Sequence, residues 1–443
     1  MKLIQTIKNI WNIEDLRRRL GITFLFILIY RFGCQVVLPG IHPQALSALK
    51  KFTDSGLMQL LDMFSGGAFS QASIFALGIM PYITASIVIQ LLGMVMPSFQ
   101  KMQREGESGR MKLNQYTRYL TVLILLVQAP AYLINLRMQV QSAGGAVDMG
   151  PWTMFYLTIV LTAGAMFIMW LGEKITDKGI GNGISMIILV GIIARLPSAF
   201  SQEFVGRLTN AQGGLIMFLV EIIVLFAITA GAVMLTQGTR KVPVQYAKRI
   251  VGNKQYGGAR QYIPLKVNAA NVMPIIFAQA LMFIPITLAG FGAQKSGFLG
   301  SIATVFGDMN GFWYNLVYFL LIVAFTYFYT AITVRPTQMA EEMKKNSGFI
   351  PGIKPSKKTA EYLDSIMSRI TLPGSLFLGI VAILPAFARL FGVNQNFAQF
   401  FGGTSLLITV GVVLDTLQQI ETHLRMHHYD GLMKSGKIKG RAS

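Results

Sequence analysis

Long apolar stretches alternate with shorter polar ones along the whole 443-residue chain. A helix needs about 20 mostly apolar residues to cross the ~30 Å hydrocarbon core of a bilayer. On this pattern we predict ten membrane spans, near residues 20–38, 72–96, 117–136, 152–171, 180–196, 214–236, 269–290, 312–333, 372–391 and 402–420. The fifth and tenth are short and partly polar. No segment shows the alternation of an outer-membrane barrel, and we therefore predict an all-α polytopic protein.

The composition agrees with a membrane protein, since 53% of the residues are hydrophobic and only 13% are charged. A soluble domain usually carries about a quarter charged residues. The net charge of +20 would also suit a nucleic-acid binder, but membrane proteins gather lysine and arginine on loops that face the cytoplasm and anionic lipid. Cys34 is the only cysteine, which excludes an intrachain disulfide. Residues 1–26 lack a cleavable signal pattern, so we expect an amphipathic cytoplasmic helix and a retained first span.

The basic residues fall mostly on one side of this arrangement. They gather in residues 1–19, in the connections 97–118, 172–179, 237–268 and 335–371, and in the tail 421–443. Because lysine and arginine concentrate on cytoplasmic loops, this alternation favours an even number of spans with both termini in the cytoplasm. We expect a multi-pass protein of the inner membrane.

Two of these connections, 237–268 and 335–371, combine basic residues with aromatic residues and prolines, and the first contains no acidic residue. Their charge can serve orientation alone. It can also form a docking surface for a large partner that carries negative charge, such as ribosomal RNA or an acidic protein face. Long loops in compact proteins tend to be functional or disordered. An acid-free stretch exceeds what orientation needs, which favours the docking surface.

Charged residues are scarce inside the predicted spans. Arg31, Glu221 and Asp415 lie near predicted interfaces, where their side chains can reach the polar region or pair with another charge. A secondary transporter is the main alternative, but it normally keeps essential charges at mid-membrane. A membrane-embedded acyl- or glycosyltransferase is a second alternative, and it needs a polar catalytic constellation that the chain does not offer.

Motifs for enzymes, nucleotides and metals are also missing. GIGNGIS at residues 179–185 resembles a glycine-rich nucleotide turn, but no strand precedes it, as a dinucleotide-binding fold requires. His423, His427 and His428 cluster in the tail without a carboxylate or cysteine partner at suitable spacing. We therefore expect no catalytic site, no cofactor and no bound metal.

Aliphatic residues recur at helical spacing in two predicted spans. The isoleucines concerned are Ile79, Ile83, Ile87, Ile184 and Ile188. This spacing suits a packing face as well as the wall of a pore, and periodicity does not separate the two. Just before the second span, the apolar stretch 57–71 is too short to cross the membrane and is interrupted by Gly66 and Gly67. A stretch of that length favours a re-entrant segment.

Six long segments carry a resemblance to a known family. They are MFSGGAFSQASIFALGIMPYITASIVIQLL (63–92), EGESGRMKLNQYTRYLT (105–121), MWLGEKITDKGIGNGIS (169–185), PLKVNAANVMPIIFA (264–278), FIPGIKPSKKTAEYLD (349–364) and FGGTSLLITVGVVLD (401–415). These segments resemble the SecY family, the central subunit of the general secretion channel. The blocks are composite, occur in order and run nearly end to end, so chance agreement is not credible.

The resemblance implies an hourglass channel of two pseudo-symmetric five-helix halves around a central pore, here residues 1–196 and 197–443. The constriction of such a channel is a ring of aliphatic side chains that gates by dewetting. It carries over to Ile79, Ile83, Ile184, Ile188, Ile276 and Ile408. A plug helix that closes the outer funnel corresponds to residues 57–70, including Phe64, Ser65, Gly66 and Gly67, and the two glycines would let it hinge away.

The resemblance also implies that the channel passes unfolded polypeptides across the membrane and releases hydrophobic segments into lipid through a lateral gate. The gate lies between spans two and three on one side and spans seven and eight on the other. Thr84, Gln128 and Asn271 match its polar cluster. Contacts among buried polar groups favour closure, because separating them strands hydrogen bonds in hydrocarbon.

Partners follow from the same resemblance. The small membrane subunits SecE and SecG would complete a heterotrimer, and secretory and membrane preproteins would be the cargo. The ribosome and the SecA motor ATPase would bind the two basic loops, through Arg240 and Lys241 at the tip of the first and Lys354 at the tip of the second. Arginine is common in the family at the position of Lys354, and the two residues are not interchangeable in bidentate contacts.

Overall fold

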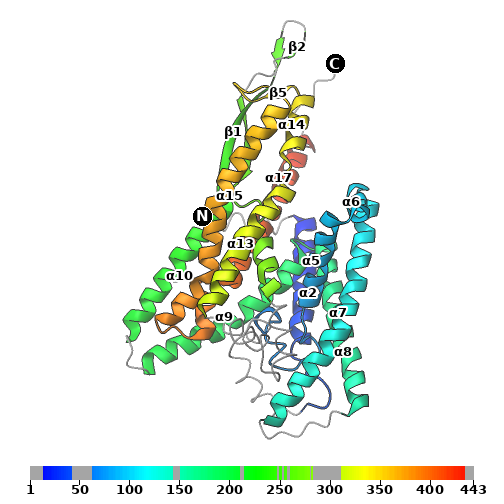
Figure 1. The fold of residues 1–443 in the computed structure, drawn as a ribbon, viewed down its shortest axis with the longest axis vertical. Coiled ribbons are helices and arrows are strands. Elements are labelled where there is room, and N and C mark those ends of the chain that lie inside the picture. The colour runs from blue at the N-terminus through cyan, green and yellow to red at the C-terminus, as the bar shows by residue number, and fades with distance from the viewer. Residues whose placement is uncertain are drawn as a thin grey trace. The chain divides into compact units, whose positions relative to one another are not determined.

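The computed structural model describes residues 13–41, 62–142, 150–209, 214–246, 249–251, 254–256, 260–279, 281–282 and 311–434. Most of them are helical (Figure 1). The chain forms two compact units, the first comprising Met1–Ser201 and Val412–Ser443 and the second Gln202–Gly411. Two long helices, α9 (Gly183–Thr209) and α17 (Gly403–Lys434), have residues in both units.

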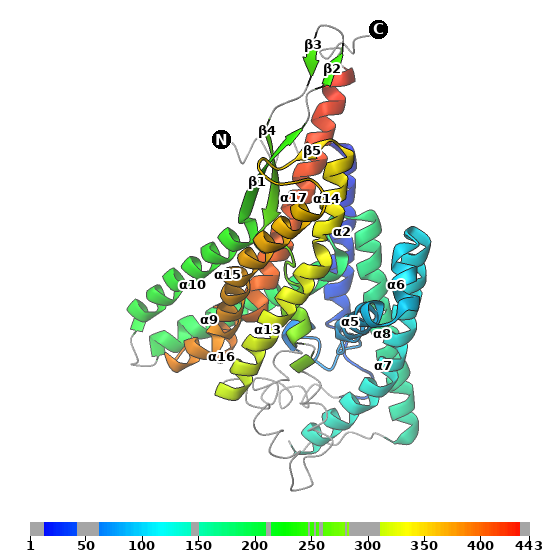
Figure 2. The ribbon, with the colours of Figure 1, turned by 45° about the horizontal axis from the view of Figure 1, so that its top comes forward.

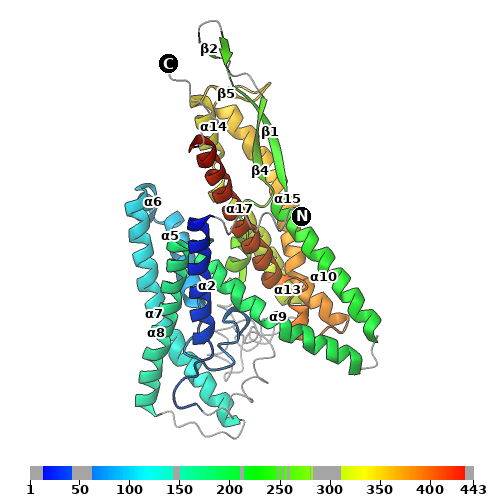
Figure 3. The same cartoon turned by 180° about the vertical axis from the view of Figure 1, so that it is seen from behind.

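In the described part of the first unit, five helices accompany α9 and α17. They are α2 (Glu14–Gly33), α5 (Met80–Val95), α6 (Pro97–Arg104), α7 (Glu107–Ser142) and α8 (Pro151–Lys178). Helices α5 and α6 pack against α7, α7 packs against α8, and α8 packs against α2 (Figure 3). Proline stands in the first turn of α5, α6 and α8, where its missing amide hydrogen has no intrahelical acceptor to lose.

The core of the first unit joins helices α7 and α8 to the segment that precedes α5. Its buried members are Leu38, Phe69, Ala72, Ala76, Ala129, Tyr132, Leu133, Leu136, Leu157 and Leu161. The members within 129–136 and 157–161 recur every three or four residues, which places them on the facing sides of α7 and α8. The Tyr132 hydroxyl, buried in this core, donates to Phe69 O (3.1 Å).

Residues 65–79 form turns ahead of α5, so the helix predicted from residue 72 begins later. Ala72 (φ 45°) and Gly78 (φ 56°) adopt left-handed conformations, which interrupt a right-handed helix. Ser73 forms an isolated antiparallel bridge with Val37 instead. Helix α5 then starts at Met80 and is followed by α6 after a bend of 103°.

The second unit contains α10 (Gly214–Gln237), α13 (Phe312–Thr333), α14 (Pro336–Lys345), α15 (Lys357–Leu390) and α16 (Gln395–Ala398). Helices α13 and α15 pack side by side over much of their length (Figure 1). Gly379 permits this approach, because a Cβ atom there would meet Phe319 Cδ2 at 2.6 Å. The predicted span 372–391 is the second half of α15.

The prediction of an all-α chain is wrong for the connection 237–268, which folds mostly as strands (Figure 2). Strand β1 (Thr239–Tyr246) pairs antiparallel with β4 (Arg260–Lys266) and with β5 (Gly348–Phe349). A separate hairpin pairs β2 (Arg249–Val251) with β3 (Lys254–Tyr256). The reason is a period of two: Val242 and Val244 are buried, whereas the residues flanking each of them are exposed or half-buried.

The buried valines of β1 meet apolar side chains from β4, α14, α15 and the turn after β5. Their buried partners are Leu265, Met343, Ile350, Leu363 and Met367. We call this assembly of β1, β4, β5, α14 and the start of α15 the basic ribbon domain. It gives the two long basic connections one shared core.

Among the described residues, seven helices are long and apolar enough to cross a membrane. They overlap the predicted spans three to six and eight to ten, with starts or ends that differ by a few residues for the fifth, ninth and tenth. The bent pair α5 and α6 would add an eighth span. In the predicted seventh span, residues 273–279 and 281–282 are helical, and residues 283–290 lie outside the described part of the chain.

Candidate functional site

A compact loop of residues 62–70, which we call the 62–70 loop, precedes α5 in the first unit. The carboxylate of Asp62 closes it by accepting Ser70 N through Oδ1 (2.7 Å). The main-chain oxygen of Asp62 accepts Gly67 N (2.8 Å) and the hydroxyl of Ser65 (3.1 Å). These bonds satisfy polar main-chain groups inside a buried segment, which would otherwise cost free energy.

The two glycines of this loop are required by its conformation. Gly66 (φ 66°) and Gly67 (φ 93°) both lie in the left-handed region, which glycine adopts without steric cost. A Cβ atom on Gly66 would meet Gly191 Cα of α9 and Arg31 Nη1 of α2, each at 2.9 Å. The two glycines therefore permit the turn of the loop and its close approach to α9, in addition to the hinge motion expected from the resemblance. Residues 57–61 of the predicted plug lie outside the described residues.

Side chains of α2 and α9 hold the loop in place. From α2, Tyr30 donates its hydroxyl to Ser65 O (3.2 Å), and Arg31 donates Nη1 to Gly66 O (2.8 Å). From α9, Arg195 reaches the same loop. All four predicted plug residues, Phe64 to Gly67, are buried.

The six predicted pore isoleucines divide between the two units. The first unit holds Ile79, Ile83, Ile184 and Ile188. The second unit holds Ile276 and Ile408. Within the first unit, Ile79 stands at the start of α5, and Ile83 N donates to Ile79 O (3.1 Å), so the two side chains project from successive turns.

The predicted polar cluster divides in the same way. Thr84 lies on α5 and donates its hydroxyl to Met80 O of the same helix (3.1 Å). Gln128 is half-buried on α7, which packs against α5. Asn271, in the second unit, adopts a left-handed conformation (φ 52°), and its main-chain oxygen accepts Asn268 Nδ2 (3.1 Å). Sequence reasoning missed Asn268, which is buried beside it.

The basic residues chosen for partner contacts are exposed, but one placement is corrected. Arg240 and Lys241 lie at the base of β1, directly after α10, and not at a loop tip. They pair in register with Leu265 and Pro264 of β4. The antiparallel pairing with β4 reverses the chain beyond Tyr246, so the tip lies further along the chain. Lys354 is exposed in the turn between β5 and α15, and its main-chain oxygen accepts the Thr359 hydroxyl (3.0 Å).

The second unit contains a buried cluster of charged residues that we did not predict from the sequence. Arg207 of α9 donates Nε to Glu203 Oε1 (2.8 Å) and Nη2 to Glu221 Oε1 of α10 (2.5 Å). Arg207 Nη2 also donates to Gly392 O (3.0 Å), and Asn394 N donates to Glu203 Oε2 (2.9 Å). Of the two possibilities left open for Glu221, reaching the polar region or pairing with another charge, the structure shows pairing. The cluster ties the end of α9 to α10 and to the turn that follows α15.

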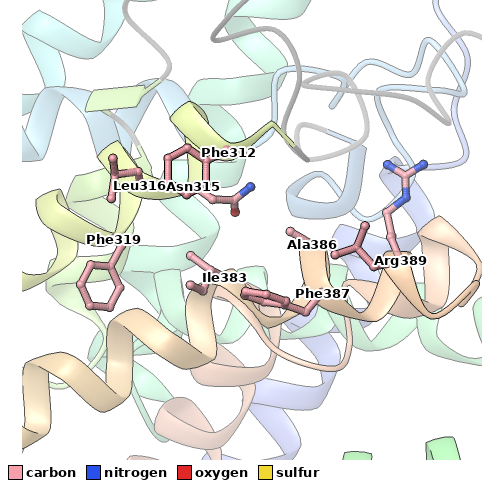
Figure 4. Close-up of a pocket in the computed structure, with 9 residues that line it drawn as sticks. Phe312, Asn315, Leu316, Phe319, Ile383, Ala386, Phe387 and Arg389 are labelled. Atoms are coloured by element: carbon pink, nitrogen blue, oxygen red, sulfur yellow. The ribbon is translucent and has the colours of Figure 1, made fainter.

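An apolar pocket of about 750 Å³ lies between the start of α13 and the end of α15 (Figure 4). Phe312, Phe319 and Phe387 line it together with Asn315 and Arg389. Its walls belong to the second unit, and none of the residues named above for the plug, the pore or the polar cluster lines it.

Several apolar helices of membrane-spanning length define a polytopic membrane protein. The fold is similar to the SecY structure in which the plug domain stabilises the closed state of the translocation channel, with a TM-score of 0.62 over 92% of each chain at 20% identity. It is also similar to Sec61 in the canine ribosome-channel complex, with a TM-score of 0.58 over 92% of each chain.

The sequence comparisons identify the family. The SecY family model matches residues 73–417. The protein translocase subunit SecY of Streptomyces scabiei is 44% identical over 429 residues, which cover 95% of this chain and 97% of that relative. The chain therefore belongs to the SecY family of protein translocase subunits. As a member of this family it is a protein translocase subunit and not an enzyme.

Proposed function

We propose that the chain forms a pore through which unfolded polypeptides cross the inner membrane, and from which hydrophobic segments leave sideways into lipid. One observation carries the proposal: residues 65–79 are non-helical, and their first part, at Gly66 and Ser70, packs against α2 and α9, two predicted spans. Non-helical backbone at membrane depth is tolerated only where protein buries it or where it lines a water-filled cavity. A closed, plugged channel provides both.

In this proposal the 62–70 loop is the plug, and the constriction is the aliphatic ring named above. Ile79, Ile83, Ile188 and Ile408 are buried, which suits a narrow apolar collar that stays dewetted at rest. Flexible aliphatic side chains can fit around an extended chain without binding any residue type strongly.

The proposed lateral gate separates α5 and α7 from residues 273–282 and α13. Thr84, Gln128 and Asn271 would contact one another in its closed state. Their separation would leave hydrogen-bonding groups without partners in hydrocarbon, so an inserting apolar helix must supply compensating free energy.

The same proposal includes the arrangement of the membrane spans. It comprises ten spans in two pseudo-symmetric halves, residues 1–196 and 197–443, with both termini in the cytoplasm. The concentration of basic residues in the ribbon domain supports this orientation. The basic ribbon domain would then face the cytoplasm and the anionic lipid surface.

We propose the ribosome and the SecA motor ATPase as partners of the basic ribbon domain, with SecE and SecG as small membrane subunits. Support comes from the exposed cations Arg240, Lys241 and Lys354 on a domain with its own apolar core. A structurally similar protein, Sec61, occurs in a ribosome-channel complex. Energy for transport would come from these partners or from the proton-motive force.

The decisive test is site-specific crosslinking of a stalled secretory chain to photoreactive residues at Ile83 and Ile276. Both positions should crosslink to the translocating chain. Ile216 of α10, which is 80% exposed, is the matched control and should react with lipid instead. Crosslinks from Ile83 and Ile276 that reach only lipid or neighbouring helices would refute the pore assignment.

A further inference from the structure

The 62–70 loop takes part in an ion pair that belongs neither to the proposed pore ring nor to the proposed lateral gate. Asp62 is fully buried (0% exposed) and forms an ion pair with Arg195 of α9. The Asp62 carboxylate also accepts Ser70 N at 2.7 Å, and Arg195 Nη2 donates to the Ser70 hydroxyl at 3.3 Å. The guanidinium of Arg195 therefore binds both ends of the loop at once and joins them to α9.

A second arginine holds the same loop at its middle. Arg31 of α2 donates Nη1 to Gly66 O at 2.8 Å. Gly191 of α9 lies against this turn, since a Cβ atom on Gly191 would stand 3.0 Å from Phe64 O. The loop is thus held at its ends from α9 and at its middle from α2, by two cations whose helices are far apart in sequence.

Because Asp62 is buried, the closed position of the loop depends on the ion pair between Asp62 and Arg195. A buried carboxylate is costly unless it is paired and hydrogen-bonded, so the loop is stable in its present place only while Arg195 faces Asp62. Salt screens a buried pair much less than a surface pair. Removing one partner leaves the other in an unfavourable environment and favours displacement of the loop toward water.

We propose that Asp62, Arg195 and Arg31 form an arginine latch that holds the 62–70 loop in its closed position and is released when the channel opens. They are positioning residues, and this inference rests on the proposed function of the loop as a plug. The latch explains why a buried acidic residue and two arginines stand around a loop that is otherwise apolar or small.

The test measures the resting ion conductance of the purified translocase, containing the full chain, in planar bilayers without a preprotein. Asp62→Asn keeps an oxygen that can accept Ser70 N and removes the charge. Asp62→Asn and Arg195→Gln should each raise the ratio of conducting to closed channels about tenfold, equivalent to about 1.4 kcal/mol. The double variant should match Arg195→Gln, because that single variant already loses both the ion pair with Asp62 and the bond to the Ser70 hydroxyl.

Arg137→Gln is the matched control, since Arg137 is an exposed arginine on α7, and it should leave the resting conductance unchanged. Replacing residues 63–69 with glycine and serine at equal length tests the plug itself. If that replacement raises conductance while Asp62→Asn and Arg195→Gln do not, the latch is wrong and the plug stands. If the replacement also leaves conductance unchanged, the plug function and the latch both fall.

Thermal denaturation of each purified variant separates gating from misfolding. The latch is supported if Asp62→Asn raises conductance while its denaturation temperature stays close to that of the parent. An equal rise in conductance for Arg137→Gln would overturn the latch, since the effect would then follow from charge alone. Should Arg195→Gln fail to assemble, Asp62→Asn decides the question by the same criteria.

Discussion

Replacing Arg207 with methionine should lower the free energy of unfolding by about 3–5 kcal/mol, the cost of breaking a buried ion pair from one side. Arg207 is only 7% exposed, and it lies between the carboxylates of Glu203 and Glu221, each 3% exposed. Methionine keeps much of the length and apolar volume of the side chain. The substitution therefore tests the charge more than the packing.

The magnitude follows from the bonds that the guanidinium donates, which include the three described above. Bonds to carboxylates run to Glu203 at 2.8 Å and to Glu221 at 2.5 Å, and a bond to the main chain runs to Gly392 O at 3.0 Å. A hydrogen bond to a charged group contributes about 1.5–3 kcal/mol. Without the arginine, two like charges remain buried close together, which adds to the loss.

The assay is SDS-induced unfolding of the purified chain in mixed micelles, followed by circular dichroism. The triple variant Glu203→Gln, Arg207→Met and Glu221→Gln is the matched comparison, because it removes the charges together. After Glu203→Gln, the side-chain amide oxygen can still accept Asn394 N, as the carboxylate of Glu203 does at 2.9 Å. Replacement of a whole buried ionic cluster is often close to neutral, so the triple variant should lie within about 1–2 kcal/mol of the parent.

Two results would refute this reasoning. The first is an Arg207→Met variant that loses less than about 1 kcal/mol, which is the range of a solvent-screened surface pair. The second is a triple variant as unstable as Arg207→Met alone, which would mean that the arginine acts through packing and not through charge.

Two further predictions concern the proposed gate and the ribbon domain. Asn271→Leu should destabilise the closed gate, because it removes a polar contact. In a translocation assay it should increase export of preproteins with weakened signal sequences several-fold. Unchanged signal selectivity would show that Asn271 is not part of the gate. Reversing Arg240 and Lys241 to glutamate should weaken ribosome binding at least tenfold, as roughly two cation contacts are lost, and should flatten its salt dependence. Lys178→Glu, an exposed lysine at the end of α8, is the control and should leave binding nearly unchanged.

The apolar pattern predicted most helices because membrane spans depend on composition over about 20 residues, a property that a single chain displays by itself. The exceptions have local causes. The start of α5 was missed because Ala72 adopts a left-handed conformation that its residue type does not announce. The strand β1 was missed although the alternation of Val242 and Val244 with polar residues was present, since a basic stretch was interpreted only as a loop.

The candidate sites divide in a similar way. Glu203 and Arg207 are four residues apart, about one helical turn, so their ion pair could be predicted from the sequence. The ion pair of Asp62 with Arg195 could not be predicted, because 133 positions separate the two residues and no helical or strand periodicity relates them.

By itself, the sequence determined the membrane class, the approximate spans and the family, because these depend on local hydrophobicity and on long composite blocks of residues. Only the tertiary structure decided that a small sheet gives both basic connections one core, and that two arginines hold the 62–70 loop. Those features arise from contacts between segments far apart in the chain. Such contacts are selected by the free energy of burying a charge or an apolar side chain against a partner, and a one-dimensional pattern does not record that partner.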